Sequence, residues 1–279
     1  MNVASMRRVF KRWVDRVTSD AHYDALFEDD ANPPAEFSRF GTLPCGYSDD
    51  AWLRALDRLN EAARIPVIIN GLNASKRPLP SGLLKAASSS NTLGLNYESC
   101  YSSTTQPRMP GAIWQSMENS ELAVTATGKM FECMARNTTP SLSANAERIY
   151  VYASFLLSYD PGTSVLWEQY ETPSRFHVEP ESQLVALDPL SPSPHDVSGL
   201  LTPSGAYARQ YRRCYIAGRF AGACAAAVNP DGASHQFPFP GYRRTLVLSG
   251  GGILDGGQIA PNGPPPGDLP ALSATIAFR

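Results

Sequence analysis

Residues 66–71 read Pro-Val-Ile-Ile-Asn-Gly, and this short stretch decides the fold class. It is a β-branched run without polar alternation, which is typical of a parallel strand covered on both faces. An amphipathic helix is predicted directly before it, with Ser48 as its N-cap, acids in its first turn and an apolar stripe that ends at Ala63. A helix that leads into such a strand indicates an α/β fold built on a parallel sheet.

The alternation of strands and helices continues on both sides of this stretch. An amphipathic helix with a basic outer face is predicted within the first 17 residues. We expect strands at residues 23–30, 93–98 and 164–170, a degenerate strand at 141–143, and helices at 114–136 and around 149–156. Such units connect by right-handed crossovers, for which a (β/α)8 TIM barrel and an open doubly wound sheet are the two main solutions.

Beyond residue 172 the helical pattern fades and Gly and Pro become frequent. Short strands separated by turns are predicted there, at residues 209–216, 222–230, 242–248 and 274–278. The sequence therefore predicts two parts, an α/β domain at residues 1–200 and a small all-β domain at residues 201–279.

Composition excludes several classes of partner and cofactor. The formal net charge of −2 gives no field that would hold nucleic acid or an anionic membrane, and no apolar run is long enough to span a bilayer, so we expect a soluble chain.

The five cysteines lack the spacing of a zinc site, and no metal or organic cofactor is expected. A disulfide between Cys214 and Cys224 would suit an exported protein, but buried free cysteines fit equally well. Export is expected if sequence upstream of Met1 is missing.

Acidic and amide side chains follow the predicted parallel strands, where α/β proteins collect their chemistry. Asp29 ends the first strand, Asn70 the second and Glu98 the third, with Glu168 on a fourth. Breaking a glycosidic bond needs one acid to protonate the leaving oxygen and a second carboxylate to attack the sugar or activate water. Two carboxylates that face one cleft would meet that need.

Three segments resemble TIM-barrel glycoside hydrolase families over about two thirds of the chain. Residues 24–30, Asp-Ala-Leu-Phe-Glu-Asp-Asp, resemble the Asp-Gly-hydrophobic-Phe-x-Asp-Asn strand whose second Asp is taken as catalytic, here Asp29. Residues 94–98, Gly-Leu-Asn-Tyr-Glu, are similar to a Gly-x-x-x-Glu strand that supplies a second acid, here Glu98. Residues 209–215 and 228–230 resemble the strand and Val-Asn-Pro turn that lead into a C-terminal β domain.

The resemblance implies the C-terminal part of a TIM barrel, with about five of its eight strands, followed by a β domain. It implies hydrolysis of O-glycosidic bonds in an oligo- or polysaccharide, with Asp29 as nucleophile or base and Glu98 as general acid, or with these roles reversed. The expected substrate contacts are Asp30, Asn70, Tyr97, Tyr101, Trp114, Trp167 and Glu168.

Each of these assignments has a structural alternative. Asp29 could cap a turn, Glu98 could be a solvated strand end, and each aromatic residue could belong to the core. The alternative function is a non-catalytic saccharide-binding or structural remnant of such a barrel.

Overall fold

The computed structural model describes residues 3–29, 46–63, 65–73, 89–103, 105–137, 145–170, 178–249, 253 and 256–279. A five-stranded parallel sheet forms the first half of the chain, in the order β1-β2-β3-β4-β5. Its strands are β1 (Leu26–Glu28), β2 (Val67–Asn73), β3 (Thr92–Glu98), β4 (Met130–Asn137) and β5 (Ser164–Tyr170). Its helices are α1 (Ala4–Ala21), α3 (Asp49–Ala63), α5 (Gly111–Thr125) and α6 (Asn145–Ser158). Ser48 caps α3 as predicted, since its hydroxyl accepts a hydrogen bond from the backbone nitrogen of Ala51 at 3.3 Å.

A six-stranded antiparallel sheet forms the second half, in the order β11-β10-β13-β8-β7-β6. Its strands are β6 (Leu184–Pro189), β7 (Tyr207–Ile216), β8 (Arg219–Asn229), β10 (Arg244–Ser249), β11 (Gln258–Asn262) and β13 (Ser273–Phe278). A two-stranded ladder joins β9 (His235–Gln236) to β12 (Asp268–Leu269), and two short 3-10 helices are η4 (Pro180–Gln183) and η5 (Val197–Leu200). The four predicted β segments correspond to β7, β8, β10 and β13, whereas β6 brings residues before 201 into this sheet.

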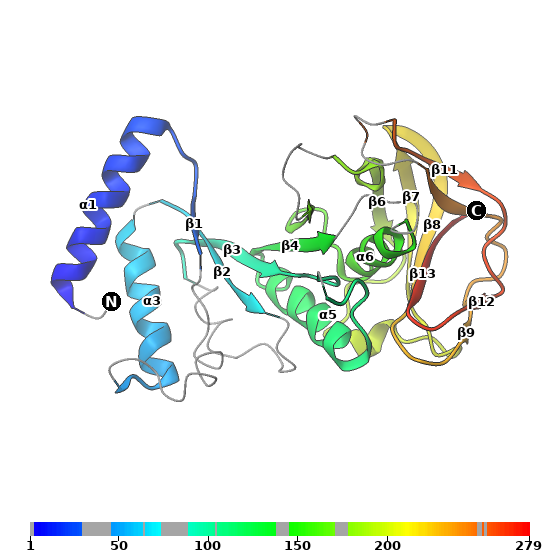
Figure 1. The fold of residues 1–279 in the computed structure, drawn as a ribbon, viewed down its shortest axis with the longest axis horizontal. Coiled ribbons are helices and arrows are strands. Elements are labelled where there is room, and N and C mark those ends of the chain that lie inside the picture. Colours follow the sequence, from blue (N-terminus) through cyan, green and yellow to red (C-terminus); the bar gives the residue numbers. More distant parts are fainter. Residues whose placement is uncertain are drawn as a thin grey trace.

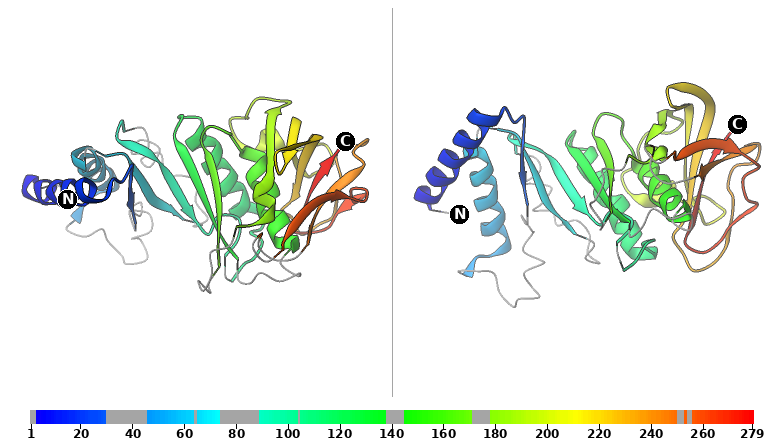
Figure 2. Two further views of the ribbon diagram at one scale, coloured as in Figure 1. Left: turned by 90° about the horizontal axis from the view of Figure 1, so that it is seen from above. Right: turned by 45° about the horizontal axis from the view of Figure 1, so that its top comes forward.

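The two sheets lie at either side of a helical layer (Figure 1). Helices α1 and α3 pack together at one end of the molecule, next to β1 and β2. Helices α5 and α6 pack against each other, and α6 also contacts β8 and β13 of the antiparallel sheet. The two further views show the same succession along the long axis (Figure 2). Helix α6 therefore connects the two halves through one continuous core.

The helix predicted at residues 114–136 is wrong in its second half, because α5 ends at Thr125 and β4 follows. Gly128 adopts a φ of +72°, a left-handed conformation that Gly adopts without strain and that ends the helical path. Beyond it, Phe131, Cys133 and Ala135 alternate into the core, which is the period of a strand. The degenerate strand predicted at 141–143 lies outside the described residues.

The parallel sheet does not close into a barrel within the described residues. Strands β1 and β5 stand at the two ends of the strand order, so each has one neighbour. The observed fold is a mixed α/β structure with a partial parallel sheet and a separate antiparallel β part.

Two disulfides stabilise the described structure. Cys214 pairs with Cys224 between β7 and β8, which decides between the two alternatives that the sequence left open, and Cys100 pairs with Cys133 between the end of β3 and β4. The fifth cysteine, Cys45, lies outside the described residues. Among the described helices, none combines the length and the apolar character that crossing a bilayer requires.

Candidate functional site

The two faces of the parallel sheet differ in what covers them. Ile69, Leu95 and Phe131 point to the helices and belong to the main core cluster. Successive strand residues alternate between faces, so their neighbours in sequence point to the opposite side, which we call the open face. Phe27 on β1 and Trp167 on β5 point to this side and are 46% and 38% exposed. The open face is therefore accessible at its outer strands, whereas Asn70 and Asn96 in its middle are 7% and 0% exposed.

A transverse row of polar side chains crosses four strands of the open face. Glu28 pairs with Ile69, so Asp29 comes beside Asn70, and the Asn70 amide nitrogen donates a hydrogen bond to Oδ1 of Asp29 at 2.7 Å. Asn70 is in register with Asn96, and Asn96 with Glu132. Parallel pairing thus brings residues from distant parts of the sequence to one level of the sheet.

Two members of this row have unsatisfied polar atoms. Asn96 is 0% exposed, and neither its side-chain oxygen nor its nitrogen has a hydrogen-bond partner among the described residues. The Oε2 atom of Glu132 is also buried without a partner in the described part of the chain. An unpaired buried amide costs about 1–3 kcal/mol, so a Leu would be more stable at position 96. A buried polar group that is left unpaired beside two carboxyl groups indicates a functional role and not a packing role.

A second row lies two residues further along the strands. Glu98 is in register with Met134, and Met134 with Trp167. Glu98 forms an ion pair with Arg136 on the neighbouring strand, and both side chains are partly exposed. Trp167, one of the predicted aromatic contacts, therefore lies on the same face of the sheet as Glu98 and at the same level along the strands.

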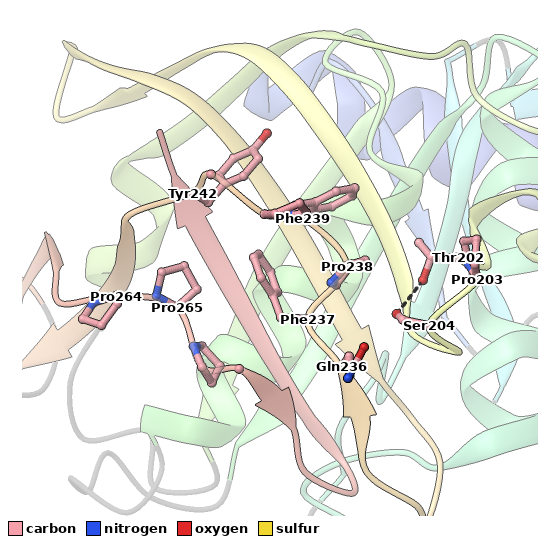
Figure 3. Close-up of a pocket in the computed structure, with 14 residues that line it drawn as sticks. Thr202, Pro203, Ser204, Gln236, Phe237, Pro238, Phe239, Tyr242, Pro264 and Pro265 are labelled. Carbon is pink, nitrogen blue, oxygen red and sulfur yellow. Dashed lines mark hydrogen bonds between the residues drawn. The ribbon is translucent and has the colours of Figure 1, made fainter.

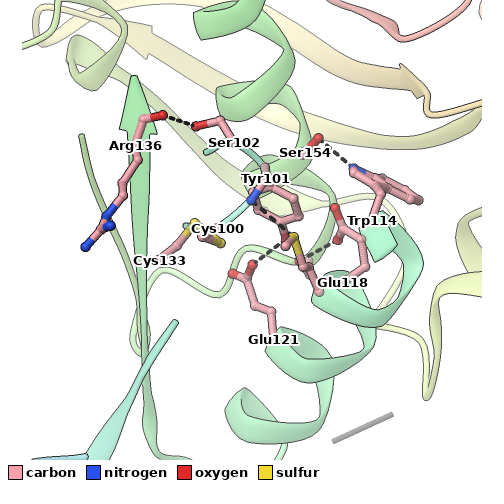
Figure 4. The surroundings of a disulfide bond; sticks show 11 residues. Cys100, Tyr101, Ser102, Trp114, Glu118, Glu121, Cys133, Arg136 and Ser154 are labelled. Carbon is pink, nitrogen blue, oxygen red and sulfur yellow. Dashed lines mark hydrogen bonds between the residues drawn. A yellow bond between two sulfur atoms is a disulfide. The ribbon is translucent and has the colours of Figure 1, made fainter. Parts of the chain in front are cut away.

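The turn directly after Glu98 holds this end of β3 in place. Ser99 and Tyr101 both have positive φ values, 63° and 57°, which are unfavourable for residues with a side chain. Cys100 between them is fixed by its disulfide to Cys133, and the backbone nitrogen of Cys100 donates to the carbonyl of Met134 at 2.9 Å (Figure 4). The covalent link makes this strained turn persist and fixes the position of Glu98.

The sheet geometry sets the distance between Asp29 and Glu98. The two residues are two strands apart and two residues apart along the strand direction. With about 4.8 Å between strands and about 3.3 Å per residue, their Cα atoms are about 12 Å apart. The Glu98 carboxyl group is held by Arg136 on β4, on the side of β3 away from β1, so this spacing is not shortened to the about 6.5–9.5 Å found in inverting glycosidases.

Three of the predicted sugar contacts belong to the core instead. Tyr97, Tyr101 and Trp114 are 2%, 0% and 0% exposed. The Trp114 indole nitrogen donates to Oγ of Ser154 at 2.8 Å, and the Tyr101 hydroxyl donates to Glu121 at 3.1 Å. A ring without exposed surface offers no face to a sugar, so these three residues are not part of the site.

The remaining predicted contacts are only partly placed. Asn70 lies in the polar row, beside Asp29. Asp30 lies outside the described residues, and of Glu168 the structure describes the backbone within β5.

Sequence reasoning missed Asn96, Glu132 and Arg136. The available signal was a polar residue in the middle of each apolar strand, but it becomes informative only when the strand register is known. Glu132 and Arg136 were hidden further by the mistaken helix at this position. Among the described residues, no group of three or more His, Cys, Asp or Glu side chains could hold a metal ion.

A second acidic pair lies on the helix side of the sheet and is wholly buried (Figure 4). Glu118 and Glu121 stand one turn apart on α5, and both are 0% exposed. Ser158 Oγ donates to Oε2 of Glu118 at 2.7 Å, and Tyr101 donates to Oε2 of Glu121. Burial raises the pKa of Glu118 well above its usual value and that of Glu121 to about 7. With no exposed surface, this pair does not contact a substrate.

Comparisons with known proteins find weak structural likeness. No family model and no curated protein sequence matches the chain. A conserved exported protein from Bacteroides fragilis aligns at a TM-score of 0.35 and 10% identity, covering 98% of this chain and 68% of that one. Pullulanase from Bacillus acidopullulyticus aligns at 0.38 and 11%, covering 97% and 40%. A glycoside hydrolase family 5 protein from Bacteroides vulgatus aligns at 0.31 and 8%, covering 98% and 86%. Scores of this size carry no functional argument, which has to come from the side chains.

Proposed function

We propose that this protein hydrolyses O-glycosidic bonds in an oligo- or polysaccharide on the open face of its parallel sheet. One observation carries the proposal. Asp29 and Glu98 lie on the same face and at the same end of the sheet, with the amides of Asn70 and Asn96 between them. Carboxyl groups, amides and an exposed indole are the side chains that saccharide hydrolysis and binding use.

The surroundings of the two carboxylates suggest separate roles. Arg136 forms an ion pair with Glu98, whereas Asp29 accepts a hydrogen bond from the neutral amide of Asn70. We therefore assign Glu98 as the base that activates water and Asp29 as the acid that protonates the leaving oxygen. This is the reverse of the order expected first, and it requires the two carboxyl groups to approach each other when substrate binds.

The other residues of the open face fit substrate positioning. Asn96 has no exposed surface, so it can position its neighbours in the row but does not itself contact a sugar. Trp167 presents an exposed ring, whose face can stack on the apolar face of a sugar. Glu132 adds a third carboxyl group, in register with Asn96.

Hydrolysis assays on single variants test the pair. Asp29→Asn is expected to abolish release of reducing ends from polysaccharides while sparing aryl glycosides, whose leaving groups need no proton. Glu98→Gln is expected to lower the rate on both substrates, by at least the 10²-fold typical of a lost general base. Asp188→Asn is the matched control, because it breaks an ion pair with Arg213 in the antiparallel part of the protein.

Two outcomes would contradict the proposal. A fully active Glu98→Gln variant would show that hydrolysis does not depend on the pair of Asp29 and Glu98. Saccharide binding that survives Asp29→Asn, in a wild-type protein that never releases product, would instead support the non-catalytic binding function.

We also propose that the protein matures in an oxidising compartment. Two disulfides support this assignment, because such bonds persist mainly in exported proteins. Thiol alkylation of the protein isolated from its native source, followed by mass measurement, is expected to leave these four cysteines unmodified. Modification at all four would overturn the assignment.

A further inference from the structure

A pocket of about 770 Å³ lies in the antiparallel part of the protein. Residues 236–242, which continue from β9, form one wall, and residues 264–267, which precede β12, form another (Figure 3). The turn at residues 202–204 closes one end. Strands β9 and β12 stand at the opposite end of the molecule from β1, so the pocket is separate from the open face of the parallel sheet (Figure 1).

Three aromatic rings form the apolar part of this pocket. Phe237, Phe239 and Tyr242 contact one another with ring centroids 5.8–6.4 Å apart. They pack onto Ala225 and Ala277, whose small side chains let the rings lie close to the sheet. Phe237 and Phe239 remain partly exposed, while Tyr242 beside them is buried. The pocket therefore offers fixed ring surfaces to a ligand.

Polar bonds hold the rings and the walls in position. The Gln210 amide donates to the Tyr242 hydroxyl at 3.0 Å, and the Arg279 guanidinium lies 5.2 Å from the centre of the same ring. The backbone nitrogen of Phe237 donates to the carbonyl of Gly267 at 2.9 Å and ties one wall to the other. Six of the fourteen lining residues are proline, whose fixed φ keeps both walls rigid. A preformed pocket loses little conformational entropy when it binds.

The lining excludes charged ligands and favours a neutral, hydroxyl-rich one. All fourteen lining residues are described, and none of them is charged. The polar groups are the hydroxyls of Thr202 and Ser204, 3.0 Å apart, and the amide of Gln236. The Thr202 hydroxyl donates to the carbonyl of Ala206 at 2.6 Å, so Ser204 is the donor to Thr202, and both hydroxyl oxygens keep acceptor capacity for the hydroxyls of a ligand. In grooves that recognise polyproline, the protein supplies the aromatic rings and the ligand supplies the prolines. Here the prolines belong to the pocket wall, which does not match that arrangement.

We infer that this pocket is a second binding site, which holds a neutral oligosaccharide with its ring faces against Phe237 and Phe239. The volume lies within the range of about 300–1,000 Å³ that small-molecule sites occupy. The hydroxyls of Thr202 and Ser204 and the Gln236 amide face the sugar hydroxyls. The site binds the saccharide without catalysing a reaction. The inference rests on the chemistry of this pocket and is independent of the proposed hydrolysis.

A pocket-filling variant tests this inference without disturbing the fold. Gly267 lines the pocket, and a Cβ built there meets no atom within 4 Å. We therefore choose Gly267→Phe, with Gly232→Phe as the control, because Gly232 has the same free space and does not line the pocket. The probes are cellohexaose, maltohexaose, xylohexaose and mannohexaose, titrated by calorimetry into the full chain carrying Asp29→Asn, so that no probe is consumed.

At least one of the four hexasaccharides is expected to bind, and Gly267→Phe is expected to weaken it at least tenfold. Gly232→Phe is expected to leave the affinity unchanged. Failure of all four probes to bind, or equal affinity in Gly267→Phe and its parent, overturns the inference. Binding of a decaproline peptide in place of every sugar, lost in Gly267→Phe, would assign the pocket to a peptide and overturn it too.

Failure of the proposed hydrolysis remains distinguishable from failure of this site. The protein could bind a hexasaccharide that Gly267→Phe weakens and yet never cleave one. That result would support this inference and contradict the proposed hydrolysis.

Discussion

The buried acids of α5 make the stability of the protein depend on pH in a direction that can be worked out. Burial raises the pKa of Glu121 from 4.5 to about 7 in the folded protein. The folded state therefore binds more protons than the unfolded state between these pH values, and stability falls as pH rises. Each unit of pKa difference is worth about 1.4 kcal/mol, so Glu121 alone costs about 2–3 kcal/mol between pH 5 and pH 8.

Glu121→Gln is expected to remove this cost and leave the packing intact. Glutamine has nearly the shape of the protonated acid, and its oxygen can still accept the hydrogen bond from Tyr101. The variant should gain about 2–3 kcal/mol in unfolding free energy relative to wild type as the pH rises from 5 to 8. Urea denaturation followed at several pH values measures this difference.

The slope with pH is the informative quantity, because any change in packing shifts both ends of the profile alike. Glu61→Gln on the exposed side of α3 is the control, and its profile should run parallel to that of wild type. Glu28, whose pKa burial also raises to about 7, contributes the same trend in every variant and cancels from the comparison. Parallel profiles for Glu121→Gln and wild type would refute the reasoning.

Three further changes test other parts of the structure. Arg148→Met should cost about 3–5 kcal/mol in denaturant unfolding, because it leaves the buried carboxylates of Glu179 and Glu181 without their shared guanidinium; a variant that also carries Glu179→Gln and Glu181→Gln should recover much of the loss, and an unchanged midpoint in Arg148→Met would contradict this. Replacing Cys214 and Cys224 together by Ser should lower the unfolding free energy by about 2–3 kcal/mol for a closed loop of this length; a loss below the error of the fit would show that the bond adds nothing. Asn96→Leu should raise the thermal midpoint while lowering saccharide hydrolysis; a lower midpoint would mean that the amide has a partner.

The sequence predicted the strands best where side-chain pattern alone decides them. Residues 164–170 form β5 with the predicted limits, and the β-branched run at 66–71 falls in β2. The segment around β4 was predicted wrongly because residues 114–136 mix apolar and polar side chains without a clear change from helical to strand period. Gly128 was the one local signal of the break, and a single Gly in a helical pattern is often tolerated.

The candidate site was predictable only in part, for a physical reason. Asp29 and Glu98 follow apolar runs and so stand out at strand ends, whereas Asn96 and Glu132 lie inside strands and gain meaning from their neighbours on other strands. Burial of the three aromatic residues depends on long-range packing, such as the contact of Trp114 with Tyr207 at 4.8 Å between ring centroids. Spacing along the chain carries no information about such contacts.

The strand register ties the candidate site to the stability of the sheet. In β3, Leu95 and Tyr97 enter the core, so Asn96 and Glu98 must face the open side. A slip of one residue would carry these polar side chains into the core and expose Leu95, so the packing that stabilises the sheet also fixes the site. What packing does not explain is the amide of Asn96, buried at a cost that an apolar residue would avoid. Proteins break such local rules mainly at functional sites, and here the break lies in the row that joins Asp29 to Glu132.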